Sequence, residues 1–137
     1  MTVNKIKISN RKVFNNSKGS VIKYVSKRDN FFKNFGEIYF NKVKNNKKKG
    51  WILHKKNFCI FFCVYGKVKF HFIDYLNKEK KIILNDKSNK VIICPPKIWF
   101  SIEGKSKESI ITNLINIPHS DKEVVKINKI KSYFIKN

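Results

Sequence analysis

Three histidines and nine acidic residues are the side chains of this 137-residue sequence best suited to proton transfer near neutral pH. His54 is the strongest candidate. It closes the run Gly50–Leu53, which is typical of a strand, and strand alternation puts it on the same face as Ile52 and Lys56. If that face points into a barrel, His54 can act as a base or hydrogen-bond a ligand. The alternative is a partly buried histidine whose ring hydrogen-bonds a backbone carbonyl, and the sequence leaves both interpretations open.

The other two histidines carry weaker signals. His71 shares a strand face with Lys67 and Lys69, which predicts an exposed ring, and His119 follows Pro118, where a structural role in a turn is the default. Zinc needs several His, Cys or carboxylate ligands close together. Since the histidines are isolated and no H-x-H motif is present, we expect no metal. Hydrolase signatures and glycine-rich phosphate loops are absent from the sequence, so no cofactor is expected either.

The three cysteines do not form a disulfide framework. Cys59 and Cys63 are four residues apart in one predicted strand, about 13 Å, which is too far for a disulfide. With Cys94 the number is odd, and no C-x-x-C motif occurs. Buried reduced thiols in a cytoplasmic protein are the simplest interpretation. The first residues contain no apolar signal region, and the longest apolar run, Phe58 to Gly66, is too short to span a membrane.

The net charge of +22 is a poor indicator of nucleic-acid binding in this chain. Of 31 basic residues, 29 are lysines, and Arg11 and Arg28 are the only arginines. The chain has no Ala or Gln but twenty Ile and seventeen Asn, a composition typical of an AT-rich genome. Nucleic-acid readers favour the bidentate guanidinium of Arg. We therefore expect neither nucleic acid nor a membrane as a partner.

Short β-type runs recur about every ten residues between polar turn clusters, a pattern typical of a sandwich or barrel. Gly66 predicts a tight hairpin, Pro95-Pro96 marks a corner, and the capping-box spacing of Ser120 and Glu123 predicts one short helix near the C-terminus. The predicted strands are Ser20–Val25, Glu37–Val43, Trp51–Lys55, Phe58–Tyr65, Lys67–Asp74, Lys81–Leu84, Lys90–Cys94, Ile98–Ile102 and Ser109–Ile115. The length fits one domain, 1–137, with a core of about 18–126 and flexible or loosely packed ends.

Several segments resemble a known group of proteins in their order and spacing. They are Lys18–Val21, Phe35–Phe40, Gly50–Lys55, Pro95–Phe100 and the closing Asn116–Val124. These segments resemble the thymidine-diphosphate 4-keto-sugar 3,5-epimerases and the related sugar 3,4-ketoisomerases, above all the short epimerase-like cupins of surface-polysaccharide gene clusters. The resemblance implies a double-stranded β-helix (cupin jelly roll), commonly a homodimer, whose barrel holds a nucleotide sugar.

The sequence departs from this family at the positions that carry its chemistry. The general base of the epimerases falls on Ile52, and the Asp that pairs with it falls on Phe70. A supporting Lys or Gln falls on Cys59, the His after the Pro-Pro corner on Phe100, and the acid Tyr on Thr112. Because Ile and Phe cannot remove a proton, the usual epimerase mechanism is not expected.

The ketoisomerases carry H-x-H in the same strand, and only the second His is present, as His54. The resemblance thus implies an epimerase- or isomerase-like protein of nucleotide-sugar metabolism in cell-surface polysaccharide synthesis. If it is catalytic, His54 is the candidate acid/base, with Tyr39 and His119 as possible helpers. The competing hypothesis is a non-catalytic cupin that binds a nucleotide sugar or supports a partner enzyme.

Candidate ligand-binding residues complete the hypothesis. Lys18 and Lys49 are expected near the barrel mouth, where they would meet the pyrophosphate of a thymidine-diphosphate sugar. Lys49 stands where the family has Arg, so it offers a point charge without a bidentate fork. Trp99, at the corner after Pro95-Pro96, is expected to contribute to the pocket.

Overall fold

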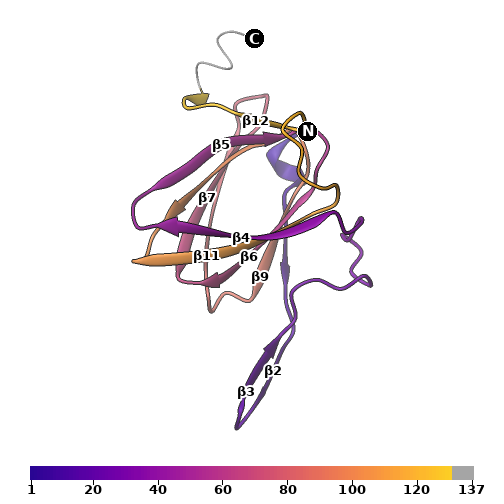
Figure 1. Ribbon diagram of the computed structural model, residues 1–137, viewed down its shortest axis with the longest axis vertical. Coiled ribbons are helices and arrows are strands. Elements are labelled where there is room, and N and C mark those ends of the chain that lie inside the picture. The colour runs from indigo at the N-terminus through magenta and orange to yellow at the C-terminus, as the bar shows by residue number, and fades with distance from the viewer. Residues whose placement is uncertain (131–137) are drawn as a thin grey trace.

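Two sheets face each other in this fold (Figure 1). Buried apolar side chains from both sheets form the main core. The computed structural model describes residues 1–130. The first sheet has the order β1 (Lys7–Asn10), β9 (Lys90–Cys94), β6 (Cys59–Tyr65), β11 (Glu108–Ile115) and β4 (Glu37–Lys44). The second has the order β12 (Val124–Lys126), β5 (Lys48–His54), β10 (Trp99–Gly104), β7 (Lys67–Ile73) and β8 (Glu79–Asn85).

The neighbouring strands in both sheets pair antiparallel, and the chain crosses repeatedly from one sheet to the other. This is a jelly-roll arrangement, so the predicted all-β fold is confirmed. Gly66 forms the β6–β7 turn with φ of +79°, a conformation that suits glycine, and a side chain there would collide with the carbonyl oxygen of Glu108. The tight turn expected at this glycine is present, but β6 and β7 belong to different sheets and do not pair with each other, so the predicted hairpin is wrong.

The main core is aromatic and lies between the sheets. Phe61 from the first sheet contacts Phe70 and Phe100 from the second, with ring centroids 4.9 and 5.2 Å apart. Phe70 and Phe72 are completely buried on β7. Burial of each such ring stabilises the fold by about 1.5–3 kcal/mol relative to exposure. The packed rings fill one part of the barrel, and the more polar part of its interior contains the site described below.

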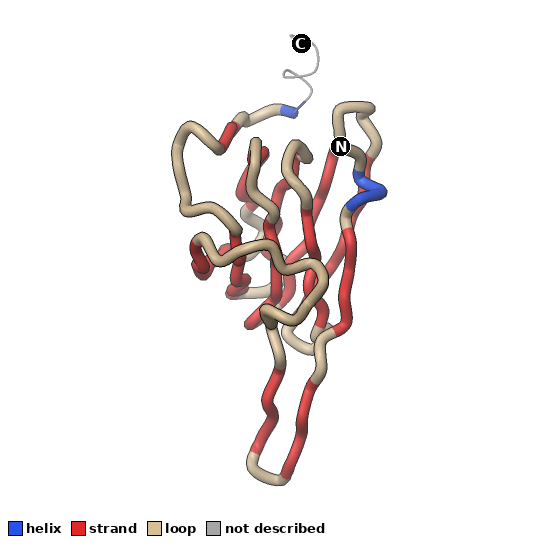
Figure 2. The backbone as a smooth tube through the Cα atoms, turned by 90° about the vertical axis from the view of Figure 1, so that its right-hand side faces the viewer, coloured by secondary structure: helices blue, strands red, loops and turns tan. Residues whose placement is uncertain are grey.

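The N-terminal residues belong to the barrel more than the sequence indicated. β1 pairs with β9, and the 3-10 helix η1 (Val3–Lys5) buries Val3, as does Ile6 after it. The core therefore begins well before residue 18, where it was predicted to start. The predicted strand Ser20–Val25 is the shorter β3 (Gly19–Ile22), which pairs only with β2 (Val13–Asn16). Figure 2 shows this hairpin projecting away from the two sheets.

The segment between β3 and β4 covers the outer face of the first sheet. Tyr24, Val25, Phe31 and Phe32 pack there against a buried cluster that includes Phe62. The expected short helix at Ser120 is a turn instead, in which the Glu123 N–H donates to the Ser120 carbonyl at 3.0 Å and the chain continues into β12. The Glu123 side chain has a different role from the capping one predicted for it. Within residues 1–130 no helix is long and apolar enough to cross a membrane.

Candidate active site

A pocket of about 300 Å³ opens between the two sheets at the end of the barrel where β5 ends and β4 begins. Strands of both sheets and the segment around β12 contribute to its walls. The lining residues are Glu37, Tyr39, Asn41, Ile52, His54, Phe61, Phe100, Ile102, Asn113, His119, Val124 and Lys126. Ile52 and His54 are both among them, which agrees with the alternation predicted for their strand. A cavity in which polar groups converge beside apolar side chains is a common form of small-molecule site.

His54 is the titratable group most firmly held in this pocket. Its Nδ1 lies 2.7 Å from Oε2 of Glu123, and both side chains are less than 10% exposed. The His54 ring also stacks on Phe100, with centroids 6.0 Å apart and planes 8° from parallel. The carboxylate and the aromatic ring together fix the orientation of the imidazole. With Nδ1 bound to Glu123, Nε2 is the nitrogen that a ligand can meet.

Glu123 is anchored by backbone as well as by His54. Its Oε1 accepts hydrogen bonds from the N–H groups of Lys56 at 3.0 Å and Asn57 at 2.9 Å. Burial opposes ionisation of this carboxyl, but the two N–H donors and the His54 ring outweigh it, so the pKa of Glu123 lies below its usual value. Glu123 is therefore a carboxylate at neutral pH. A carboxylate at this distance is placed to accept a hydrogen bond from Nδ1 of His54.

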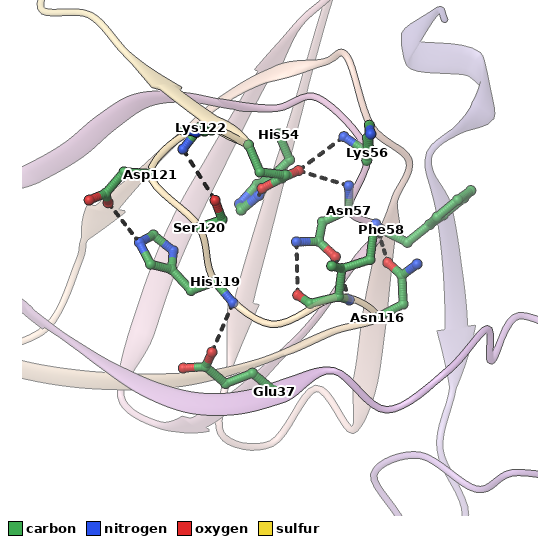
Figure 3. Close-up of polar contacts among 12 residues, drawn as sticks. Glu37, His54, Lys56, Asn57, Phe58, Asn116, His119, Ser120, Asp121 and Lys122 are labelled. Atoms are coloured by element: carbon green, nitrogen blue, oxygen red, sulfur yellow. Dashed lines mark hydrogen bonds and ion pairs between the residues drawn. The ribbon is translucent and has the colours of Figure 1, made fainter.

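A network of hydrogen bonds fastens the segment that carries Glu123 onto the barrel (Figure 3). The Asn57 side chain donates to the Ile117 carbonyl at 3.1 Å and accepts from the Ile117 N–H at 2.7 Å. The Phe58 N–H donates to the Asn116 side chain at 2.8 Å. The turn after β5 therefore holds the segment before Glu123 at Asn116 and Ile117. The same turn also holds the Glu123 carboxylate. The pairing of His54 with Glu123 is built into the fold.

Tyr39 and His119, the predicted helpers of His54, also line the pocket. Tyr39 extends from β4, and its hydroxyl accepts a hydrogen bond from the Asn113 amide at 2.8 Å. His119 lies nearer the surface: its backbone N–H donates to Glu37 at 2.9 Å, and its Nε2 lies 3.2 Å from Asp121. His119 is half-exposed, so the structure places it at the rim, whereas Tyr39 lies deeper.

The three predicted ligand-binding residues lie in three different places. Lys49 is near the rim, where its ammonium group contacts the side chain of Asn41. Lys18 lies in the tight turn of the β2–β3 hairpin, outside the pocket, and does not line it. Trp99 is 2% exposed in a cluster with Trp51 and Ile73, under residues near the C-terminus. This cluster is separate from the pocket, because Trp99 and Phe100 alternate along β10 and only Phe100 faces the pocket. The placement of Lys18 and Trp99 thus does not fit a ligand contact within this chain.

Sequence reasoning did not place Glu123 beside His54, or Asn113 and Lys126 in the pocket. Glu123 was assigned to a helix cap, and its 69-residue separation from His54 leaves no local pattern. Asn113 faces the pocket in a strand of mostly apolar residues, so an interior polar residue was the available signal. Lys126 was one lysine among 29. Within residues 1–130, no three His, Cys, Asp or Glu side chains cluster in a way that could hold a metal ion.

Comparison with known proteins identifies the family. The chain matches the WxcM-like, C-terminal (FdtA) family over residues 4–134, nearly its whole length, and therefore belongs to that family. A comparison with curated proteins gave no match.

Solved structures with similar folds include sugar isomerases and epimerases. A dTDP sugar isomerase from Desulfovibrio desulfuricans G20 is 19% identical, with a TM-score of 0.89 over 96% of this chain and 89% of that one. QdtA, a sugar 3,4-ketoisomerase from Thermoanaerobacterium thermosaccharolyticum solved with TDP, is 19% identical, with a TM-score of 0.82 over 98% and 95%. A dTDP-4-dehydrorhamnose 3,5-epimerase from Elizabethkingia anophelis NUHP1 is 12% identical, with a TM-score of 0.78 over 90% and 75%. These similarities establish the cupin-like fold.

Proposed function

We propose that this protein is a nucleotide-sugar isomerase of the 4-keto-6-deoxy type, acting in cell-surface polysaccharide synthesis, with His54 as its acid/base. The observation that carries the proposal is the buried His54–Glu123 pair at the wall of a pocket lined by both polar and apolar side chains. A histidine oriented by a carboxylate is a common arrangement for general acid–base catalysis. The proposal is supported by the family and by the sugar isomerases that share the fold.

The chemistry requires one base beside the sugar ring. His54 Nε2 removes the proton from the carbon next to the ketone, and the electron pair of that C–H bond forms a double bond to the carbonyl carbon. The carbonyl oxygen gains a proton from solvent, which gives an enediol. Return of the proton from His54 to the former carbonyl carbon, with loss of the proton from the neighbouring hydroxyl to solvent, produces the isomeric ketone. Glu123 stabilises the imidazolium between the two transfers.

Two lysines at the open side of the pocket are suited to the diphosphate of the substrate. Lys126 lines the pocket from β12, and Lys49 lies beside it on β5, next to Asn41. β12 and β5 are paired strands, so both ammonium groups come from one edge of the second sheet. Each supplies a positive charge and single hydrogen bonds to phosphate oxygens, without the bidentate geometry of Arg.

One observation favours the alternative, a non-catalytic protein that binds a nucleotide sugar. Ile52 lies two residues before His54 on the pocket face, where the family resemblance implies the general base. Phe61, Phe100 and Ile102 also make the wall beside His54 apolar. Such a pocket can bind a sugar ring without reacting with it, and the two functions differ only in whether His54 moves a proton.

Hydrogen exchange separates these functions. The protein is incubated in D2O with TDP-4-keto-6-deoxyglucose, and NMR follows deuterium entering the sugar carbons next to the ketone. We expect deuterium at C3 and a 3-keto product, together with binding of TDP measured by calorimetry. Binding without exchange would establish the non-catalytic alternative. Neither binding nor exchange would show that the nucleotide-sugar function is wrong.

We also propose that the protein forms a homodimer. Phe14, Val21 and Ile22 of the β2–β3 hairpin are exposed, and a two-stranded hairpin is marginally stable on its own in water. A second copy that packs against this hairpin would cover the apolar side chains. Analytical ultracentrifugation of the wild type is expected to give twice the monomer mass. Phe14→Ser with Val21→Ser is expected to shift the equilibrium towards monomer, and an unchanged dimer would assign the interface elsewhere.

A further inference from the structure

A second polar group faces the pocket from the first sheet. Asn113 on β11 and Tyr39 on β4 are direct cross-strand partners, and the Asn113 Nδ2 donates to the Tyr39 hydroxyl oxygen at 2.8 Å. Both side chains line the pocket. The His54–Glu123 pair belongs to β5 and the segment before β12, on the second sheet. A ligand between the sheets therefore meets the acid/base from one side and the Tyr39–Asn113 pair from the other.

The hydrogen bonds within this pair fix which atoms remain for a ligand. The Asn113 NH2 group donates to the Tyr39 hydroxyl, and the amide partly opposes the burial that raises the pKa of the Cys59 thiol. The Tyr39 oxygen accepts from Asn113, which leaves its own proton to be donated. Burial, with a smaller contribution from Cys59, raises the pKa of Tyr39 to about 12, so that proton is present at neutral pH.

The oxygen of the Asn113 side chain is the unusual atom. Asn113 is 1% exposed, and among the described residues its Oδ1 has no hydrogen-bond partner. Buried polar atoms without partners are rare in folded proteins, because desolvation is not compensated, and each one calls for an explanation. Since Asn113 lines the pocket, a donor on a bound ligand would satisfy this atom.

We infer that Asn113 determines specificity by accepting a hydrogen bond from the hydroxyl next to the ketone of the sugar, while Tyr39 donates to the ketone oxygen. The pair presents one donor and one acceptor side by side. The donor is the Tyr39 hydroxyl, and the acceptor is the Asn113 oxygen, which belongs to the same amide whose NH2 group bonds to Tyr39. An α-hydroxyketone presents the complementary acceptor and donor on adjacent carbons. The inference rests on the proposed function and names the part of the substrate that the first sheet recognises.

The test compares two ligands that differ by one hydroxyl: TDP-4-keto-6-deoxyglucose and its 3-deoxy analogue, with TDP alone as the reference. Calorimetry on the wild type is expected to show that the hydroxylated sugar binds about 10- to 100-fold more tightly, the range for one buried hydrogen bond. Asn113→Leu, close in shape but without polar atoms, is expected to bring this ratio to about one while TDP affinity is retained. Asn41→Leu, the same change at another pocket-lining Asn, is the matched control and is expected to keep the ratio.

Each outcome decides the inference. If the wild type binds both sugars equally, or if Asn113→Leu keeps the preference, Asn113 does not recognise the hydroxyl, and the proposed function stands. If the wild type binds neither sugar nor TDP, the proposed function and this inference both fail. Should Asn113→Leu not fold, as judged by near-UV circular dichroism, the wild-type ratio alone decides. Tyr39→Phe gives a second variant, expected to weaken binding of both keto sugars relative to TDP while keeping the preference between them.

Discussion

Two His–Glu pairs with nearly the same nitrogen–oxygen distance lie on opposite faces of the second sheet. His54 and Glu123 are 2.7 Å apart inside the barrel, and His71 and Glu79 are 2.6 Å apart on its outside. The carboxylates differ most: the side chain of Glu123 is 8% exposed and that of Glu79 is 53% exposed. Two backbone N–H groups also hold Glu123. The comparison shows that a short His–carboxylate distance does not by itself define a site.

The two imidazoles differ in their surroundings as the two carboxylates do: His54 lies in the more enclosed site. His54 stacks on Phe100 at the wall of the pocket. The His71 ring packs edge-on against Trp51, with ring centroids 4.9 Å apart, and the ammonium of Lys48 lies over the same indole. Burial lowers the pKa of His71, Glu79 opposes this effect, and Lys81 and Lys48 add to it. The outer pair is thus a surface contact among lysines, whereas the inner pair is buried, anchored and open to a ligand. The outer pair provides a matched control for experiments on the inner one.

The largest effect is expected from His54→Asn. Asn keeps a hydrogen-bonding side chain but cannot carry a proton, so deuterium exchange with the keto sugar is expected to fall by about 10²- to 10⁴-fold. TDP binding, measured by calorimetry, is expected to remain. His71→Asn makes the same change in the outer pair and is expected to keep the wild-type exchange rate. Equal losses in both variants would remove the distinction between the two pairs.

A smaller effect, on stability, is expected from Glu123→Gln. Loss of the carboxylate removes a charge-assisted hydrogen bond at a buried site, which costs about 1–3 kcal/mol of unfolding free energy. Glu79→Gln in the outer pair is expected to change it by less than about 0.5 kcal/mol, as for most surface substitutions. Urea unfolding of both variants checks this difference, and a larger loss in Glu79→Gln would reverse the ranking.

The inner pair also predicts how stability responds to acid. The pKa of Glu123 is lower in the folded chain than its usual value of 4.5, so its contribution is complete above that pH and is lost as the pH falls below it. Asp74 behaves in the same way below 3.8, because the N–H groups of Val3, Lys78 and Leu76 outweigh its burial. Thermal unfolding between pH 6 and 3 is expected to show a weaker acid dependence in Glu123→Gln than in the wild type. An unchanged dependence would mean that Glu123 is not held as a carboxylate.

The sequence predicted the fold and one member of the inner pair, His54. Strand alternation is a local signal, so it identified nine strands and the shared face of Ile52 and His54. The partner of His54 was missed because the fold brings Glu123 to it across 69 residues. Capping-box spacing gave Glu123 a local role, but its carboxylate accepts hydrogen bonds instead from the backbone N–H groups of Lys56 and Asn57 in the turn after β5.

The outer pair shows a related limit of local patterns. Alternation with Lys67 and Lys69 put His71 on the outer face of the sheet, but its side chain is 18% exposed, against Trp51, and not exposed as predicted. Its neighbour Glu79 comes from the adjacent β8. For Trp99, proximity in sequence to Phe100 was misleading, because adjacent strand residues face opposite sides of a sheet. Which strands pair, and with which register, cannot be deduced from one strand at a time.

The smallest expected effect concerns the outer pair and separates the two pairs by pH. The pKa of His71 lies below its usual 6.5 in the folded chain, so stability is fully present above that pH and is lost as the pH falls through the lowered value. Because the Glu79 partner is half-exposed, we expect the loss between pH 7 and 5 to stay within about 0.5 kcal/mol. This loss of stability between pH 7 and 5 is expected to disappear in His71→Asn and to persist in Glu123→Gln. The Glu123 substitution alters the acid dependence of stability below pH 4.5 instead. Thermal unfolding of the three proteins at closely spaced pH values measures this. If the wild type instead gains stability relative to His71→Asn as the pH falls from 7 to 5, Glu79 outweighs burial and the lysines, and the two pairs are more alike than their surroundings indicate.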